Sequence, residues 1–402
     1  MNDYLTAKEA ADMLGISLPT LYAYVSRGKI SSQAAGGKTR ARHYRREDVV
    51  ALLERKEVRR DPAVAAEQAL SFGTPVLTSA LTLIENGRLF YRGHDVMQLA
   101  QERPFAEVAA LLWTGEFATA SLFSTQVPEA TWQRLEETQE ILFQFPTIAR
   151  LQALLPLAAT IDLAAYDLTQ VPQTGVRILQ LLTWGVVGKR PFGTIVDSLQ
   201  EAWCPEQPAA RFLLNAALIL CADHELNVSS FTGRCVASAN SNPYAVVAAG
   251  LAALQGPKHG GHTARTAAVL REIEQPEEAR TAVSSRLHRG EPLSGFGHKL
   301  YQAGDPRGRL LLKLTEERLG ENTAVLRSKV LIHEVREILN QEPTIDLALV
   351  TVAQALNLPP DAPIVLFALG RTVGWLGHAL EQYQRNQLIR PRAKYIGEQP
   401  TA

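Results

Sequence analysis

The stretch that decides the fold reads Gly295-Phe-Gly-His-Lys-Leu-Tyr-Gln-Ala-Gly-Asp-Pro-Arg307. Glycines at 295 and 297 allow backbone angles that other residues resist, so His298 can be presented at a turn. The Asp-Pro pair then turns the chain so that Arg307 can face the same cavity. A neutral imidazole donates a hydrogen bond to a carbonyl, and a guanidinium holds a carboxylate through two parallel bonds. Together these two side chains suit a keto acid.

Further motifs accompany this stretch in a fixed order along the chain. They read His224-Glu-Leu-Asn-Val-Ser-Ser230, Gly256-Pro-Lys-His-Gly-Gly261, Thr344-Ile-Asp346, Gly370-Arg371 and Ile389-Arg-Pro-Arg-Ala393. In that order and at those spacings, the chain resembles the citrate synthase family. The stretches 87–95 and 108–115 look like the N-terminal signature of that family, so the resemblance covers roughly residues 70 to 397.

The resemblance implies a mainly α homodimer. A large domain of about residues 62–258 and 358–402 is expected to hold a small domain of 259–357, with the active cleft between them. Helical periods dominate from residue 76 onward, for example over 130–143 and 177–187. Short strands are expected only around residues 80 to 91, and Pro172 and Gly175 are interpreted as parts of a connection between helices.

The resemblance also assigns the chemistry. Joining an acetyl thioester to a keto acid requires a base for the methyl proton and two hydrogen-bond donors, one for the enol oxygen and one for the ketone oxygen. In this chain the base falls on Asp346, the enol donor on His259 and the ketone donor on His298. An apolar setting, Thr-Ile-Asp-Leu-Ala-Leu349, is expected to raise the pKa of Asp346. The alternative role for this carboxylate is helix capping.

The substrate contacts follow from the same resemblance. Oxaloacetate carries two carboxylates, so several cations must converge on it. The residues that match the family's binding positions are His224, Asn227, Arg307, Phe367, Arg371 and Arg390. The equivalent of Arg390 reaches into the neighbouring subunit's site in the family. Lys299 matches a coenzyme A contact, whereas Gln302 replaces a basic residue found in many relatives.

The resemblance implies no permanently bound cofactor, because the coenzyme A thioester is a substrate. His259 and His262 form a His-Gly-Gly-His pair, but without a partnered carboxylate or cysteine cluster the sequence argues against zinc. His262 stands where many relatives have alanine and is interpreted as incidental. The reaction, a step of the tricarboxylic acid cycle, has a near competitor. A 2-methylcitrate synthase uses propionyl-CoA, which has one methylene more than acetyl-CoA. One methylene changes the free energy that separates two substrates by only about 1 to 3 kcal/mol, so the motifs do not decide between them.

Bulk properties place the chain among globular enzymes. Its 402 residues allow two or three domains, and 46% hydrophobic with 20% charged residues is ordinary for a folded protein. Three cysteines are too few for a disulfide framework, which favours a reducing cytoplasm. The N-terminus lacks the pattern of an export signal, and no apolar run approaches the length of a membrane helix.

The first 60 residues differ from the rest in charge. They hold twelve Lys and Arg against seven Asp and Glu, although the whole chain has a net charge of zero. Thr6 and Glu9 form a capping box before a helix over 7–14, and a second helix follows Ser17 and ends before Gly28. Residues 4–55 resemble the excisionase and MerR type of winged helix-turn-helix.

This resemblance implies a DNA partner for the N-terminal module. The residues expected to contact DNA are Thr20, Tyr24 and Arg27 of the second helix, in the major groove, and Arg40, Arg42 and Arg45 of the wing, on phosphates. The alternative is a solvated basic face on a small appendage. A function of another class remains an alternative. The chain would then be a transcription regulator that uses the citrate synthase-like body as a metabolite sensor.

Overall fold

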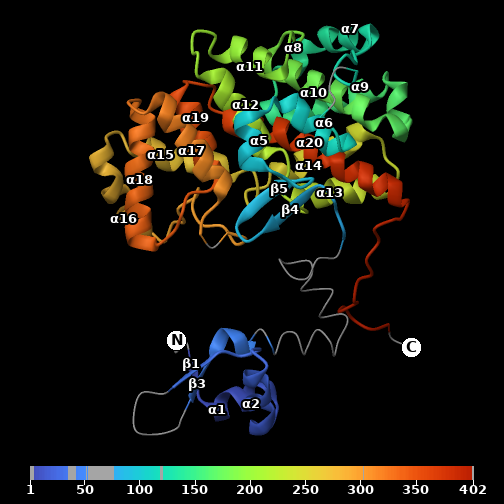
Figure 1. Ribbon diagram of the computed structural model, residues 1–402. Coiled ribbons are helices and arrows are strands. Elements are labelled where there is room, and N and C mark those ends of the chain that lie inside the picture. The colour runs from blue at the N-terminus through green and yellow to red at the C-terminus, as the bar shows by residue number, and fades with distance from the viewer. Residues whose placement is uncertain are drawn as a thin grey trace. The chain divides into compact units, whose positions relative to one another are not determined.

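The computed structural model describes residues 4–34, 42–50, 52, 77–117, 121–301 and 303–400 (Figure 1). The chain divides into two units, Met1–Thr78 and Ser79–Ala402. The expected boundary after residue 61, the linker that follows it, and the residues Arg40 and Gln302 lie outside the described residues. The division of the second unit into large and small domains stays a prediction.

The first unit is a winged helix-turn-helix. Its strands β1 (Tyr4–Leu5), β3 (Arg42–Arg45) and β2 (Ser32–Ala34) form an antiparallel sheet in that order beside helices α1 (Ala7–Leu14) and α2 (Leu18–Ser26). Residues 46–50 are helical, which is an earlier start than the Asp48 expected from the sequence.

Local signals fix this unit. The Thr6 hydroxyl accepts a hydrogen bond from the Glu9 amide, and the Glu9 carboxylate accepts one from the Thr6 amide, which confirms the capping box. Gly15 then ends α1 at φ 58°, a left-handed angle that a glycine adopts without strain. Leu14, Leu21, Ile30 and Val49 bury their side chains in a small core.

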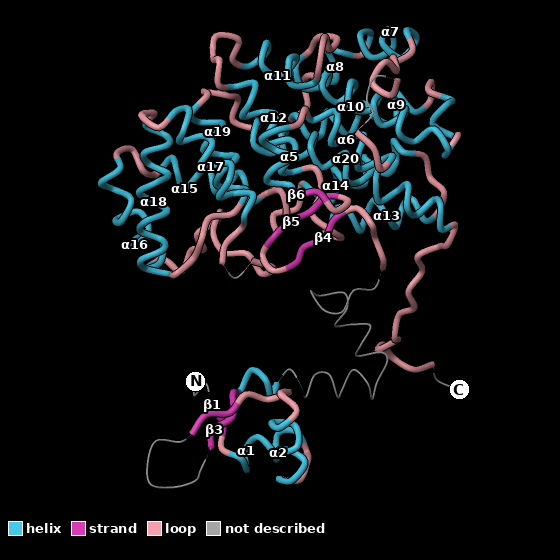
Figure 2. The backbone as a smooth tube through the Cα atoms, in the orientation of Figure 1, coloured by secondary structure: helices cyan, strands magenta, loops and turns pink. Residues whose placement is uncertain are grey.

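The second unit opens with a three-stranded antiparallel meander and is otherwise helical (Figure 2). Its strands are β4 (Thr82–Glu85), β5 (Arg88–Tyr91) and β6 (His94–Asp95). Asn86 and Gly87 turn the first hairpin at φ 53° and 73°, the left-handed pair that a two-residue hairpin requires. The first two strands lie within residues 80 to 91, where the sequence predicted strands, whereas β6 lies beyond that range.

One group of helices packs around the long helix α20 (Ala362–Arg385), which crosses the middle of this unit (Figure 1). Its members are α5 (Val96–Glu102), α6 (Phe105–Thr114), α7 (Glu129–Glu137), α8 (Gln139–Leu142), α9 (Thr147–Ala159), α10 (Val171–Val187), α11 (Ile195–Trp203), α12 (Ala210–Cys221), α13 (Val228–Ser238) and α14 (Pro243–Leu254). Two short 3-10 turns, η1 (Leu163–Tyr166) and η2 (Leu168–Gln170), precede α10.

Close packing between α20 and its neighbours requires glycine at two positions. A Cβ added to Gly250 of α14 would lie 2.5 Å from the Trp375 ring, and one added to Gly370 would lie 2.5 Å from the Leu218 carbonyl oxygen. By length and composition α20 could cross a membrane, but 89% of its most apolar window is buried inside the unit. It is therefore a core helix of the described fold.

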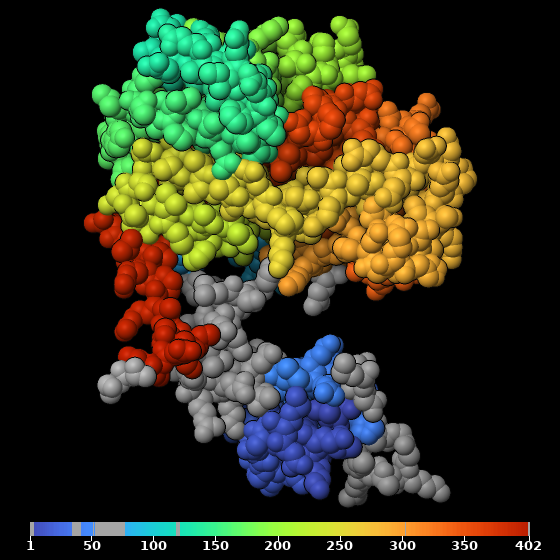
Figure 3. Space-filling model, turned by 180° about the vertical axis from the view of Figure 1, so that it is seen from behind, coloured from blue at the N-terminus to red at the C-terminus, as the bar shows by residue number. Residues whose placement is uncertain are grey.

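A second group of helices has its own core. It comprises α15 (His262–Arg271), η3 (Pro276–Glu278), α16 (Ala279–His288), α17 (Pro306–Leu319), α18 (Thr323–Leu339) and α19 (Ile345–Ala355). Val269, Leu270, Phe296, Leu331 and Leu347 are buried in this core. Seen from behind, the yellow surface of α14 continues into the gold and orange surface of this group (Figure 3).

Two helix predictions were wrong in detail. The helix expected over 177–187 begins at Val171, because Pro172 occupies its first turn and Gly175 lies inside it. A Cβ at Gly175 would meet the Trp113 ring at 2.9 Å, so this glycine serves close packing rather than a connection. The helix expected over 130–143 is interrupted at Thr138 and forms α7 and α8.

Candidate active site

The loop between α16 and α17 presents His298 as the sequence predicted. Gly295 and Gly297 adopt φ 94° and 74°, angles in the left-handed region. The Leu300 amide donates to Nδ1 of His298 at 3.2 Å, so the neutral ring carries its proton on Nε2. Burial lowers the pKa of His298, and the charge of Arg307 lowers it further. His298 is therefore a neutral donor through Nε2.

His224 lies against this loop from the other helical group, just after α12. Its ring centroid is 5.3 Å from that of His298, and its Nε2 is 2.9 Å from the Tyr301 hydroxyl. Burial lowers the pKa of His224 well below the usual histidine value, and the charges of Arg307 and Arg371 act in the same direction. The bond between His224 and Tyr301 joins the two helical groups at the site.

Arg307 lies in the first turn of helix α17 and is buried together with Asp305. Its Nε and Nη2 donate to the two carboxylate oxygens of Asp305 at 3.0 and 2.8 Å. The same carboxylate caps α17 through the Arg307 amide and accepts a bond from the Ile345 amide. The sequence interpreted Asp305 as a turn residue, whereas it is the counter-ion that holds the arginine in place.

Arg371 on α20 is the second buried arginine whose charge acts on His224. Its Nε donates to the Cys221 carbonyl at 2.8 Å, and its guanidinium lies 4.7 Å from the Phe367 ring centroid. The side chain is 1% exposed, and Nη1 and Nη2 have no hydrogen-bond partner among the described residues. Because buried donors without a hydrogen bond are costly, these two nitrogens suit the carboxylate of a ligand.

His259 follows α14 and lies beside Ser229 of α13. Its Nε2 is 2.8 Å from the Ser229 hydroxyl, and its ring meets the Phe367 ring edge to face. Burial lowers the pKa of His259 to about 4, with Arg371 and His262 contributing. The single proton of the Ser229 hydroxyl is donated to Asn227, so in this geometry Nε2 of the neutral His259 ring donates to Ser229.

Asn227 caps α13 through its side-chain oxygen, which accepts from the Ser230 amide at 3.1 Å. It also accepts from the Ser229 hydroxyl at 2.8 Å. Asn227 therefore supports the serine beside His259, and the binding role given to it remains a prediction.

Asp346 occupies the first turn of α19. The Thr344 hydroxyl donates to its Oδ2 at 3.3 Å. Burial raises the pKa of Asp346, against the opposing charges of His262 and Arg307. The expected shift toward a base is present, and the N-cap position of this helix is held by Thr344.

Two of the predicted site residues, Arg390 and Lys299, are exposed, unlike the buried or half-buried arginines and histidines of this cluster. Arg390 is exposed in the irregular segment after α20, which leaves the helical body toward the C-terminus (Figure 1). The amide of Ile389 donates to the Ser238 hydroxyl at 3.1 Å and ties the start of this segment to α13. Lys299 is exposed next to His298.

The predicted DNA contacts differ in exposure within the N-terminal module. Arg27, Arg42 and Arg45 are exposed. Tyr24 is half-buried, with the Lys29 ammonium 5.6 Å from its ring centroid. Thr20 is half-buried, and its hydroxyl lies 2.9 Å from that of Ser17. The outer face of α2 is instead formed by Leu18, Tyr22 and Ser26.

Three residues of the cluster were not singled out from the sequence as functional: Ser229, Tyr301 and Asp305. Each stands within three residues of one that was, inside a quoted motif. Proximity in sequence was the available signal, but the hydrogen bonds that give them a role come from helix caps and contacts between segments far apart in the chain.

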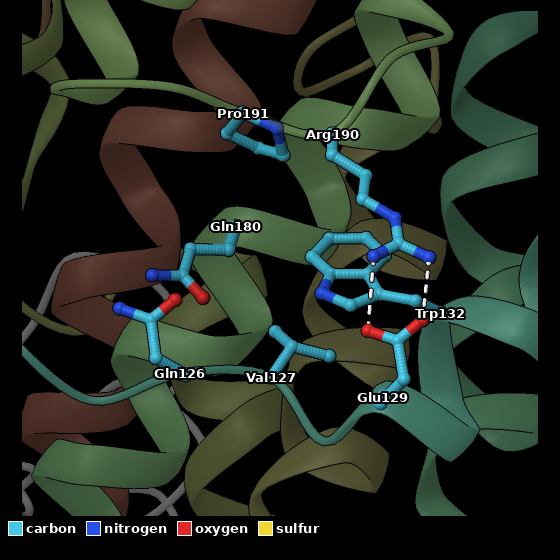
Figure 4. A pocket seen from close by; sticks show the side chains of 7 residues that line it. All are labelled: Gln126, Val127, Glu129, Trp132, Gln180, Arg190 and Pro191. Atoms are coloured by element: carbon cyan, nitrogen blue, oxygen red, sulfur yellow. Dashed lines mark hydrogen bonds and ion pairs between the residues drawn. The ribbon is translucent and has the colours of Figure 1, made fainter.

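A separate cavity of about 340 Å³ lies elsewhere on the second unit and is lined by Gln126, Val127, Glu129, Trp132, Gln180, Arg190 and Pro191 (Figure 4). The Arg190 guanidinium donates to Glu129 and Glu136 through four bonds of 2.6 to 3.0 Å. Two carboxylates thus neutralise this arginine. No group of three or more metal-ligating side chains occurs in the described parts of the chain.

Neutral imidazoles, buried arginines and a carboxylate of raised pKa together define a site for acid–base chemistry on an anionic carbonyl compound. The family model "Citrate synthase, C-terminal domain" matches residues 70–392, and a "Helix-turn-helix domain" model matches residues 4–57. The chain belongs to the citrate synthase family, and it carries a helix-turn-helix domain ahead of the family region.

Individual relatives agree with this assignment. "Citrate synthase 2" of Bacillus subtilis is 31% identical over 359 residues, covering 81% of this chain and 94% of that protein. The "2-methylcitrate synthase" of Shewanella oneidensis is 26% identical over 346 residues, covering 79% and 91%. Among solved structures, the citrate synthase of Thermotoga maritima aligns with a TM-score of 0.69 at 26% identity, over 82% of this chain and 96% of that one.

Proposed function

We propose that this protein joins the methyl carbon of acetyl-CoA to the ketone of oxaloacetate and then hydrolyses the thioester to citrate and free CoA. The observation that carries the proposal is the buried Arg371 guanidinium, which has two nitrogens without a partner among the described residues and whose charge acts on His224 and His259. An anionic ligand would supply the missing hydrogen bonds.

Each step has a residue suited to it. Asp346 takes the methyl proton, and its raised pKa strengthens it as a base. His259 donates from Nδ1 to the enol oxygen once the Ser229 hydroxyl turns its single proton from Asn227 to Nε2. His298 donates from Nε2 to the ketone oxygen, which becomes the hydroxyl of citrate.

The first test is release of CoA thiol by the purified full chain with oxaloacetate. Asp346→Asn keeps the shape of the side chain and removes the base, so it should abolish release. Turnover that survives this change would contradict the assignment of the base. Comparing acetyl-CoA with propionyl-CoA under the same conditions tests the 2-methylcitrate alternative, which the Shewanella relative keeps open.

The active form is proposed to be a homodimer that shares Arg390 between subunits. Exposure of this arginine on a segment outside the helical body supports the idea, because within its own chain it reaches none of the catalytic side chains described above. Two inactive variants, Asp346→Asn and Arg390→Ala, can be mixed and allowed to exchange subunits. A shared site predicts recovery of about one quarter of the wild-type activity, since half of the dimers are then mixed and half of the sites in the mixed dimers are intact. Recovery of none would place Arg390 in its own subunit's site or outside the site.

The N-terminal module is proposed to bind DNA, which makes the sensor role a second candidate function. Exposed Arg27, Arg42 and Arg45 support it, because the Arg45–Glu47 pair is solvent-exposed and can be exchanged for a phosphate. Replacing the three arginines by alanine should reduce the slope of log affinity against log salt by about 3. Exposed Lys8 on α1 provides the control, and affinity unchanged on deleting residues 1–60 would refute DNA binding.

Binding of DNA that changes with oxaloacetate or CoA would favour the sensor over an enzyme alone. A cytoplasmic location is proposed as well. It is supported by the three cysteines, Cys204, Cys221 and Cys235, which are all free thiols. Cell fractionation that recovers the protein outside the cytoplasm would refute it.

A further inference from the structure

Tyr301 contacts two histidines of the site, although the sequence gave it no role. Its hydroxyl is 2.9 Å from Nε2 of His224, and its ring centroid is 4.8 Å from that of His298. The two imidazole rings are 5.3 Å apart and meet edge to face. The tyrosine side chain is 3% exposed. One buried phenol therefore holds His224 by its hydroxyl and packs on His298 with its ring.

The backbone of the loop fixes this phenol independently of its hydroxyl. The Tyr301 amide donates to the His298 carbonyl at 3.2 Å, and the Gly304 amide donates to the Tyr301 carbonyl at 3.1 Å. The Gly297 amide donates to the Glu342 carbonyl at 2.9 Å and ties the loop to the segment before α19. Removing the hydroxyl should therefore leave the Tyr301 ring in place.

The hydrogen bond between Tyr301 and His224 has a favoured direction. Burial raises the pKa of the Tyr301 phenol and lowers the pKa of His224 well below the usual histidine value, so both side chains are neutral. A phenol is more acidic than the N–H of a neutral imidazole, and an imidazole nitrogen is more basic than a phenol oxygen. The hydroxyl therefore donates to Nε2. In the reverse direction its own hydrogen would be buried without an acceptor among the described residues.

The neutral His224 ring then carries its proton on Nδ1. This nitrogen has no hydrogen-bond partner in the described parts of the chain, yet it is not one of the side-chain atoms that are both buried and without a partner. It is therefore open to solvent or to a ligand. His298 carries its own proton on Nε2, because its Nδ1 accepts from the Leu300 amide. Two neutral N–H donors on adjacent rings suit the oxygens of an anionic keto acid.

We propose that Tyr301 is a positioning residue that keeps His224 in the tautomer that donates from Nδ1 to the keto acid. This inference rests on the proposed function, through the contact of His224 with oxaloacetate. The hydroxyl acts through Nε2 of His224 and does not itself touch the substrate. Without it the proton of His224 can move to Nε2, which turns Nδ1 into an acceptor that repels the oxygens of an anion.

Tyr301→Phe keeps the ring and removes the hydroxyl. The KM and the Kd for oxaloacetate should rise about tenfold, because a hydrogen bond to a charged group is weakened. The kcat should stay within about threefold, because a contact made equally in the ground state and the transition state affects KM alone. The matched control is Tyr244→Phe, which removes the bond from an equally buried hydroxyl to Asp162, outside the cluster, and should leave KM unchanged.

Nitrogen-15 NMR of the ligand-free full chain, labelled in histidine, reports the tautomer directly. His224→Gln removes one set of ring signals and so assigns them to His224. The proton should be on Nδ1 in the wild type and should move in part to Nε2 in Tyr301→Phe. Thermal unfolding reports whether each variant is folded, and the wild-type spectrum tests the proposal even if Tyr301→Phe fails to fold.

A proton on Nε2 of His224 in the wild type would overturn the proposal. An unchanged tautomer or an unchanged KM in folded Tyr301→Phe would do the same. Loss of all turnover in that folded variant would also overturn it, since the hydroxyl would then act in the reaction itself.

Calorimetric binding of oxaloacetate separates this inference from the function on which it rests. If the wild type binds oxaloacetate but releases no CoA, and Tyr301→Phe binds it more weakly with a changed tautomer, the proposed reaction fails and the role of Tyr301 stands. If the wild type turns over and Tyr301→Phe keeps its KM and its spectrum, only the role of Tyr301 fails. If the wild type does not bind oxaloacetate, both proposals fail together.

Discussion

Replacing Asp305 by asparagine should destabilise the protein far more than its change of a single atom suggests. The carboxylate accepts four hydrogen bonds, three from Arg307 and one from the Ile345 amide, and the side chains of the pair are 0% and 3% exposed. Asparagine can still cap α17, but its amide nitrogen would face a donor and the arginine charge would be left buried without a counter-ion. Breaking one partner of a buried pair costs about 3 to 5 kcal/mol.

The assay is thermal unfolding of the full chain without ligand. A loss of about 4 kcal/mol corresponds to a fall in Tm of roughly 8 °C for a unit of this size. Asp95→Asn is the matched control, because Asp95 also caps a helix and pairs with an arginine, Arg88, but in an exposed pair. Its loss should stay below about 1 kcal/mol.

The effect should also depend on pH. Burial alone would raise the pKa of Asp305, but the charge and hydrogen bonds of Arg307 outweigh it and hold that pKa below the usual aspartate value. Stabilisation by the pair is then fully present above about pH 4 and is lost as the pH falls through the folded-state pKa. A Tm for Asp305→Asn within about 2 °C of the Asp95→Asn value at neutral pH would refute this reasoning.

Three further changes have expected outcomes. Gly250→Ala should lower stability by about 2 kcal/mol, because its Cβ would lie 2.5 Å from the Trp375 ring, and an unchanged Tm would show that the helices can separate. Ser229→Ala should lower kcat about tenfold by freeing His259 to adopt the other tautomer, with the KM for oxaloacetate unchanged; a rise in KM alone would assign the serine to binding. Leu21→Ala should remove about 2 to 4 kcal/mol from the N-terminal module and make it sensitive to protease while CoA release continues, whereas loss of turnover would show that the body depends on the module.

Sequence reasoning succeeded where the cause is local. Helix α1 begins and ends as expected because Thr6, Glu9 and Gly15 set its two ends through hydrogen bonds and backbone angles within the segment itself. The positive φ of Gly295 and Gly297 followed from the turn in the same way. The family was identified from motifs in order, which needs no knowledge of their contacts.

Prediction from the sequence failed where the surroundings of a residue depend on how it packs in the folded protein. Gly175 looked like a connection, but the ring of Trp113 makes it a packing position inside a helix. Tyr24 was expected on the outer face of α2, yet burial of Leu21 sets the rotation of that helix and turns Tyr22 outward instead. Asp305 was interpreted as a turn residue, because the sequence does not show that it forms a buried ion pair with Arg307.

Binding of a keto acid at the buried guanidinium of Arg371 should couple the stability of the folded protein to the concentration of that ligand. Two buried donors without a protein partner among the described residues suit an anionic ligand, and a ligand that binds only the folded form at 100 times its Kd adds about 2.7 kcal/mol. Resistance to heat and to proteolysis should therefore rise and fall with the supply of keto acid, even in a variant that cannot turn it over.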